Sequence, residues 1–199
     1  MEWSDKIFNE GEIFEFESMQ DNPDLQEFVE TYHYSGTIAR GCSFNFVLLH
    51  NGHVFGVAQF GVPSGMKYNN VATIECKRFV LLEGQPKNVS SWFLSKCIKM
   101  LKSYEMFDNI LSFADKEHGH VGTIYKAANF KFVGEQGKKG QVIHWKGKDY
   151  HLRQVYQKLN GQYTKPAIEM QARLKTGEAY YRSTEKKNIY VFDLKGKKK

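Results

Sequence analysis

The 199-residue sequence is short of cysteine, of long apolar runs and, in its last third, of acidic residues. Its three cysteines, Cys42, Cys76 and Cys97, form no CxxC pair, which argues against a disulfide framework and against a structural zinc site. No run of 18 apolar residues and no basic-then-apolar leader is present, so we expect a cytoplasmic protein. The hydrophobic content of 41% is ordinary for a folded chain, and the length of 199 residues predicts one domain, or a domain with an added piece.

Charge is distributed unevenly along the chain. Residues 1–30 hold ten acids and one lysine, residues 31–130 hold ten bases and six acids, and residues 131–199 hold seventeen bases and six acids. A basic C-terminal third predicts contact with a polyanion, although a solvated surface would explain the terminal lysines alone. Tyrosines are interleaved with the basic residues. Such a mixture suits a nucleic-acid surface, where cations contact phosphates and aromatic rings stack on unstacked nucleobases. The candidate DNA-binding residues are Arg153, Lys158, Arg173, Lys175, Arg182, Lys186 and Lys187.

Hydrophobic periodicity predicts an α+β fold. Strands are expected over 7–19 and 71–82, a hairpin over 42–61 around Asn51-Gly52, and helices after Pro23 and over 89–104. A last hairpin is expected from 130–135 and 141–145. We predict a core domain over 1–146 and a disordered basic tail over 195–199. An extension over 147–194, with helix-like segments and a final strand, should pack on this core.

The loop between strand 71–82 and the following helix is a candidate anion site. The N–H groups of a helix N-terminus and the helix dipole can hold a pyrophosphate. Asn88 would equally serve as a plain N-cap. Arg78, on the preceding strand, is expected on the apolar side with Ile74 and Cys76, where it would bind a phosphate or a carboxylate. The candidate phosphate-binding residues are Arg78, Lys87, Asn88, Ser90 and Ser91.

Residues 110–130 are the candidate catalytic segment. A short buried strand ends at Ala114 and delivers Asp115, and a short helix ten residues further on carries Tyr125. A carboxylate at a strand end and a phenol on the next helix can face one cleft and transfer protons. Asp115 could instead be a loop cap, and Tyr125 a core aromatic. His118-Gly119-His120 is interpreted as a flexible loop rather than a metal site.

The first predicted helix ends in Tyr32-His33-Tyr34-Ser35-Gly36. A partly buried histidine is favourable at the negative end of a helix, so His33 has a structural explanation. Two rings, an imidazole and a terminating glycine are an unusual combination. For a lone histidine, the structural explanation is normally the right one.

Four segments resemble the Mom family of phage DNA modification proteins: SFAD at 112–115, GTIYKAANF at 122–130, HYSG at 33–36 and PKNVSS at 86–91. The resemblance implies the fold of the acyl-CoA-dependent N-acetyltransferases (GNAT), a mixed twisted sheet flanked by helices. It implies a phage-encoded enzyme, acting in the host cytoplasm, that attaches a small acyl-derived, carbamoylmethyl-type group to N6 of adenine in DNA and protects the DNA from restriction. The donor would be acetyl-CoA or a related acyl donor.

The resemblance also implies roles for single residues. Asp115 would be the general base or orienting group, Tyr125 the acid toward the departing thiolate, and His33 and Tyr34 would lie at the acceptor. Iron is implied by the resemblance alone, with His33 and Asp115 as the nearest ligand candidates. A flipped or single-stranded adenine would be the substrate, and a homodimer is left open.

Two rival functions remain from the sequence. An acyltransferase acting on a small amine or on a protein would share the fold but would not need a basic C-terminal third. A non-catalytic DNA-binding protein would keep its function after Asp115→Ala and Tyr125→Phe.

Overall fold

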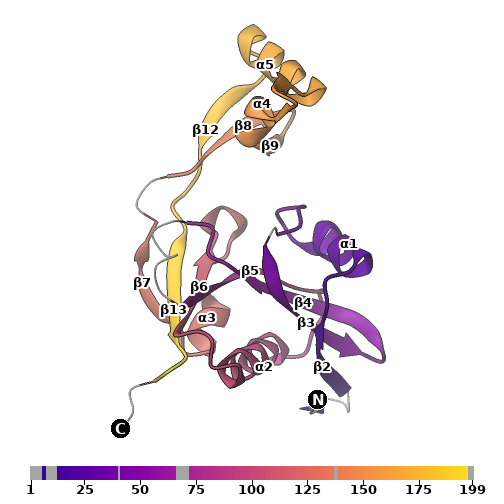
Figure 1. The fold of residues 1–199 in the computed structure, drawn as a ribbon, viewed down its shortest axis with the longest axis vertical. Helices are drawn as coiled ribbons and strands as arrows, with labels where there is room; N and C mark the ends of the chain where they lie inside the picture. Colours follow the sequence, from indigo (N-terminus) through magenta and orange to yellow (C-terminus); the bar gives the residue numbers. More distant parts are fainter. Residues whose placement is uncertain (1–5, 8–12, 40, 66–71, 137–138, 197–199) are drawn as a thin grey trace. The chain divides into compact units, whose positions relative to one another are not determined.

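The structure is a computed structural model that describes residues 6–7, 13–39, 41–65, 72–136 and 139–196 (Figure 1). The chain forms two compact units. The first unit contains residues 1–114, 120–134 and 188–199, and the second contains residues 115–119 and 135–187. The predicted boundary after residue 146 differs from this division, because the second unit starts earlier and the last strand belongs to the first unit.

The first unit is built on an eight-stranded sheet with the order β1-β2-β3-β4-β5-β6-β13-β7. Neighbours from β1 to β5 are antiparallel, β5 and β6 are parallel, and β6 and β13 are antiparallel. The predicted Asn51-Gly52 turn is confirmed, with positive φ at both residues. The strands are β1 Lys6–Ile7, β2 Ile13–Met19, β3 Cys42–His50, β4 His53–Gly61, β5 Thr73–Leu81, β6 Asn109–Ala114, β7 Lys131–Glu135 and β13 Asn188–Asp193.

Helices cover both faces of this sheet. They are α1 (Pro23–Tyr32), α2 (Val89–Ser103) and α3 (Thr123–Ala127). One apolar core contains residues of α2 and α3, and the other contains Leu25 and Val29 of α1. Alternate residues of the same strands enter different cores, so α1 lies on the face opposite to α2 and α3. The predicted start of α1 is confirmed, because the Leu25 N–H donates to the Asn22 side chain at 3.0 Å.

The parallel strands β5 and β6 part before β5 ends. Their last matched residues are Cys76 and Ser112, whereas β5 continues to Leu81. Next to this point the pairing of β5 with β4 slips by one residue, because Gln59 lies opposite Arg78 and Phe60 opposite Cys76. The extra residue is a β-bulge, which bends and twists the strand locally. The sheet therefore opens just beyond Cys76 and Ser112.

The second unit has a three-stranded antiparallel sheet with the order β12-β8-β9 and a separate two-stranded hairpin, β10-β11. Its core contains Ile143, Val155, Met170 and Ala179. A short 3-10 helix, η3 (Lys116–His118), also belongs to it. Its other elements are β8 Gln141–Trp145, β9 Lys148–His151, α4 Arg153–Tyr156, β10 Lys158–Leu159, β11 Gln162–Tyr163, α5 Lys165–Thr176 and β12 Tyr180–Ser183.

The predicted hairpin of 130–135 with 141–145 is wrong. β7 lies next to β13 in the first sheet, whereas β8 pairs with β9 and β12 in the second. The helix-like segment after residue 149 forms only the single turn of α4. Of the predicted basic tail, residues 197–199 lie outside the described residues. No helix within the described ranges is long and apolar enough to cross a membrane.

Candidate active site

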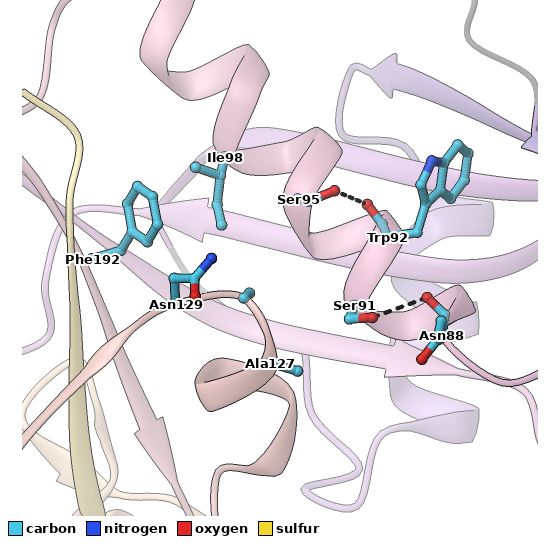
Figure 2. Close-up of a pocket in the computed structure, with 9 residues that line it drawn as sticks. Asn88, Ser91, Trp92, Ser95, Ile98, Ala127, Asn129 and Phe192 are labelled. Atoms are coloured by element: carbon cyan, nitrogen blue, oxygen red, sulfur yellow. Dashed lines mark hydrogen bonds between the residues drawn. The ribbon is translucent and has the colours of Figure 1, made fainter. Parts of the chain in front are cut away.

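A cavity of about 360 Å³ lies beside the first half of α2 in the first unit. Figure 2 shows the side chains of α2 on one side of it and the end of α3 on the other. This volume is within the range of small-molecule sites. The lining residues are Asn88, Ser91, Trp92, Ser95, Ile98, Ala127, Ala128, Asn129 and Phe192. Of these, the sequence predicted only Asn88 and Ser91.

The start of α2 borders this cavity and is suited to an anion. Asn88 occupies the N-cap position with φ 74°, and its side chain does not cap the helix. The Val89 N–H donates to the Pro86 carbonyl at 3.3 Å, whereas the N–H groups of Ser90 and Ser91 lack this capping acceptor and can donate to a phosphate. Ser91 donates its hydroxyl hydrogen to the Asn88 carbonyl at 3.1 Å, and Ser90 accepts from the Gln85 amide at 3.3 Å. Lys87 is exposed and adds positive charge next to this turn.

A buried polar cluster lies where β5 and β6 part. Cys76, Ser112 and Tyr125 are all buried, and the phenol lies close enough to the Ser112 hydroxyl and the Cys76 thiol to interact with both. The Ser112 hydroxyl has no hydrogen bond of ordinary geometry within the described part of the chain. Burial raises the pKa of the Cys76 thiol to about 12 and raises the pKa of the Tyr125 phenol well above its usual value. Both groups therefore stay protonated near neutral pH.

The ring of Tyr125 is also a core aromatic, as its alternative interpretation proposed. Its centroid lies 5.4 Å from that of Phe130 and 5.5 Å from that of Tyr190. Only its hydroxyl reaches the polar cluster. Ser112 was missed by sequence reasoning, and the available signal was a polar residue at the centre of the apolar strand ILSFA.

The predicted acceptor residues His33 and Tyr34 lie together. Their ring centroids are 4.2 Å apart, and the Tyr34 ring also lies 5.1 Å from that of His120, which the sequence assigned only to a loop. His33 is buried, and its Nδ1 accepts from the Ser35 N–H at 3.1 Å, which places the proton of a neutral ring on Nε2. Tyr34 is 42% exposed, so its ring is accessible to a flat ligand.

Arg78 is not on the side of the sheet that the sequence predicted. The bulge shifts the alternation of side chains along β5. Arg78 therefore lies on the same face of the sheet as Val80, which packs in the core with α1, and not on the face of Ile74 and Cys76. The Arg78 Nε and Nη2 donate to the Thr37 carbonyl and hydroxyl at 3.0 and 3.2 Å. Desolvation lowers the pKa of the guanidinium, but an arginine stays charged. Arg78 thus fastens the segment after α1, which carries Tyr34.

Asp115 directly follows β6, as predicted, and both of its carboxylate oxygens have partners. The Glu117 N–H donates to Oδ1 at 3.2 Å, and the Lys187 Nζ lies 2.8 Å from Oδ2. Asp115 belongs to the second unit and Tyr125 to the first. The prediction that they share one crevice stays a prediction.

Several predicted DNA-binding residues of the second unit have structural partners. Arg182 forms a double hydrogen bond with Glu117, at 3.2 and 2.7 Å, and an ion pair with Asp149. The Arg173 guanidinium lies 3.8 Å from the centre of the Trp145 ring. Lys158 and Lys175 are exposed, Lys186 and Lys187 are half-buried, and the side chain of Arg153 is outside the described residues.

The donor set does not fit the iron that the resemblance implied. Across the described residues no three histidine, cysteine or acidic side chains group as a metal site requires. His33 already binds Ser35 through Nδ1, and Asp115 pairs with Lys187.

The comparison with protein families supports the resemblance. The model of the Mom protein family matches residues 18–199. The chain belongs to the Mom family. A curated relative, the methylcarbamoylase mom of Escherichia phage Mu, is 28% identical over 115 residues, which cover 53% of this chain and 48% of that protein. The match thus spans about half the length of this relative.

A solved structure with a TM-score above 0.5 confirms the fold. The IAA acetyltransferase from Bacillus cereus has a TM-score of 0.52 at 13% identity, covering 90% of this chain and 99% of that one. A GNAT family acetyltransferase from Elizabethkingia anophelis with acetyl-CoA bound has a TM-score of 0.48 at 11% identity, covering 90% and 97%. The predicted α+β fold of GNAT type is therefore confirmed for this member of the Mom family.

Proposed function

We propose that this protein is a DNA modification enzyme that transfers a small acyl-derived, carbamoylmethyl-type group to the N6 amine of adenine in DNA, and that the product resists restriction. The observation that carries the proposal is membership of the Mom family over residues 18–199. The similarity to a methylcarbamoylase of phage Mu supports the type of group transferred. The cavity at α2 supports a separate donor molecule.

The donor in this proposal is acetyl-CoA or a related acyl donor. Its phosphates would be held by the N–H groups of Ser90 and Ser91 at the start of α2, by Lys87 and by the Ser90 hydroxyl, and the Ser91 hydroxyl would have to leave the Asn88 carbonyl to donate as well. The rest of the donor would occupy the adjoining cavity. The opening of the sheet beyond Cys76 and Ser112 gives a path for an extended chain between β5 and β6.

Tyr125 would act as the proton donor. Because its pKa is raised well above the usual value, the phenol carries its proton near neutral pH and can hydrogen bond to, or protonate, a departing thiolate. The same shift excludes it as a base at neutral pH. The buried Ser112 hydroxyl lies close to the phenol and is the nearest polar group on β6 that could accept its proton in a hydrogen bond once a donor is bound.

The acceptor amine is a weak nucleophile and is enclosed in a duplex, so the adenine must leave the stack or come from a single strand. The exposed Tyr34 ring beside His33 and His120 offers a surface on which a base can stack. Asp115 would orient the amine. Both of its carboxylate oxygens already have partners, but each keeps a lone pair that can accept a hydrogen bond from the amine.

Two other functions are consistent with parts of the structure. An acyltransferase for a small amine or a protein would use the same cavity but gives no reason for a second unit rich in lysine and arginine. A non-catalytic DNA-binding protein gives no reason for a buried phenol in a polar cluster or for a cavity at the start of α2. The following experiment distinguishes both functions from the proposed one.

The test is to express the protein in bacterial cells, digest their DNA and search the nucleosides by mass spectrometry for a modified deoxyadenosine. Tyr125→Phe keeps the buried ring and should lower the modified fraction by about 100-fold or more. Asp115→Asn keeps the size of the side chain and should lower it as well.

Thermal unfolding and DNA binding of both variants should match the wild type, which separates lost chemistry from lost folding. Unmodified nucleosides in cells that contain folded wild-type protein would contradict the proposal. Equal modification by Tyr125→Phe would contradict only the role of the phenol.

A further inference from the structure

The β10-β11 hairpin is a short and well-defined projection of the second unit. Its two strands are joined by Asn160 and Gly161, with φ of 50° and 81°. Positive φ at both turn residues is the geometry of a type I′ turn, which fits the twist of a tight hairpin. The Thr164 N–H donates to the Gln157 carbonyl at 3.0 Å and closes the base. The tip is therefore fixed in shape before it meets a partner.

The tip exposes apolar groups to water. Leu159, directly before the turn, is 69% exposed, and Tyr156 and Tyr163 are 61% and 40% exposed. A single exposed leucine needs no explanation, but Leu159 stands at the tip of a projection that carries the exposed Tyr163 ring on its other face and follows the exposed Tyr156 of α4, so the hairpin is a candidate contact surface.

The two faces of the hairpin differ in chemistry. Lys158 lies opposite Tyr163, and its Nζ is 4.6 Å from the centre of the Tyr163 ring. Leu159 lies opposite Gln162. Because neighbouring residues of a strand point to opposite faces, the leucine and the glutamine share the face that lacks the lysine.

The charge of the second unit indicates what kind of partner fits this tip. Residues 115–119 and 135–187 contain thirteen bases and seven acids, so the net charge of +6 of the whole chain resides in this unit. Lys158 and Lys165 stand on either side of the turn and are exposed. An apolar tip flanked by cations is complementary to a stack of bases flanked by phosphates.

We propose that the β10-β11 hairpin enters the DNA duplex and that Leu159 fills the space left by an extruded adenine. The inference rests on the proposed function, which requires the adenine to leave the stack. Apolar side chains that enter between bases offset part of the cost of unstacking. The Gln162 amide, on the same face, can donate and accept hydrogen bonds and so can pair with the base left without its partner. Lys158 and Lys165 hold the flanking phosphates.

The test uses the full chain and duplexes in which one 2-aminopurine replaces adenine, prepared with every combination of neighbouring bases. The fluorescence of 2-aminopurine rises when it leaves the stack. At saturating protein, Leu159→Ala should lower this rise about tenfold while the affinity for duplex changes little. Leu159→Met should restore the rise, because it keeps an apolar side chain of similar volume.

Ile168→Ala is the matched control. Ile168 is an apolar residue of α5 that is 55% exposed in the same unit, so its substitution removes a similar area from a different surface. It should leave the fluorescence unchanged. With single-stranded 2-aminopurine DNA, wild type and Leu159→Ala should bind equally, because no base has to be extruded.

The outcomes separate the hairpin from the function. An undiminished rise with Leu159→Ala, or an equal loss with Ile168→Ala, would overturn the role of the hairpin and leave the proposed function standing. Absence of DNA binding by the wild type would contradict both. Capture of a protein, with no fluorescence change on DNA for the wild type, would assign the tip to a protein partner and overturn the inference.

Discussion

The two units differ in where their charge and their apolar surface lie. The first unit contains fifteen bases and fifteen acids, whereas the second contains thirteen and seven. The electrically balanced unit contains the cavity and the buried phenol, and the basic unit exposes its tyrosines and lysines. Under the proposed function, the first unit would enclose the small donor and the basic second unit would attract the polyanion.

The units also differ in how they are stabilised. The first has two apolar cores, one on each face of a large sheet. The second buries only a few apolar side chains and adds ion pairs, including those of Arg182 with Glu117 and Asp149. Substitutions that disturb packing should therefore act most strongly on the first unit, and changes of charge or pH on the second.

The largest effect is expected from a pair of glycine substitutions. Gly122 and Gly177 have nearly the same positive φ, 82° and 79°. A Cβ at Gly122 would overlap the buried ring of Tyr190, whereas a Cβ at Gly177 meets nothing. Gly122→Ala should destabilise the protein by about 3 kcal/mol or more, because strain and a packing clash add. Gly177→Ala should cost about 1 kcal/mol for the backbone alone.

The measurement is thermal or urea-induced unfolding of both variants beside the wild type. Equal effects would show that the close approach of Gly122 to Tyr190 adds nothing to the backbone strain. A larger effect for Gly177→Ala would contradict the expectation that the first unit is the more sensitive to substitutions that disturb packing.

Most elements of the first unit could be predicted from the sequence, because turn and cap residues next to them determine where they begin and end. The Asn51-Gly52 turn fixes the β3-β4 hairpin, and Asn22 followed by Pro23 fixes the start of α1. Asp115 at the end of β6 follows from an apolar run that stops at Ala114. Such features depend on residues within a few positions of one another.

The features that the sequence did not predict depend on distant partners. The side of the sheet that Arg78 takes is set by a bulge against β4, and a one-residue slip reverses all later side chains. β7 was assigned to a hairpin with β8 because they are neighbours in the chain, whereas it lies beside β13. The proximity of Cys76 to Ser112 requires the pairing of β5 with β6, which no local pattern reveals.

A double substitution of lysines tests whether the second unit holds DNA. Lys158 and Lys175 are exposed and form no ion pair within the described ranges. Lys158→Gln with Lys175→Gln should weaken DNA binding and lower the salt dependence of log Kd by roughly 0.9 for each phosphate that is no longer neutralised. The matched control is Lys99→Gln with Lys102→Gln, two exposed lysines of α2 in the first unit.

Affinity measured by fluorescence anisotropy over a range of salt concentrations gives both quantities. The control pair should leave the slope unchanged. Equal weakening by the two pairs would mean that binding follows overall charge and not the second unit.

The smallest effect is expected from the Arg182 network. Hydrogen bonds from Arg182 lower the pKa of Glu117 and of Asp149. The His144 Nδ1, 2.8 Å from the Asp149 Oδ1, also lowers the pKa of Asp149. A carboxyl whose folded pKa is lowered stabilises the fold above its usual pKa and loses this contribution as the pH falls through the lowered value. Arg182→Gln should therefore cost more stability at pH 7 than at about pH 3. The effect should be small, because exposed pairs are weak.

Arg173→Gln separates this linkage from a general loss of positive charge. The main interaction of Arg173 is with the Trp145 ring, and Glu169 lies further away at 3.7 Å. An interaction with an uncharged ring does not titrate, so the cost of Arg173→Gln should change little between the two pH values. Thermal unfolding of both variants at each pH makes the comparison. A cost of Arg182→Gln that stays constant with pH would mean that Glu117 and Asp149 are not held by this guanidinium, and that packing, as in the first unit, also holds the second together.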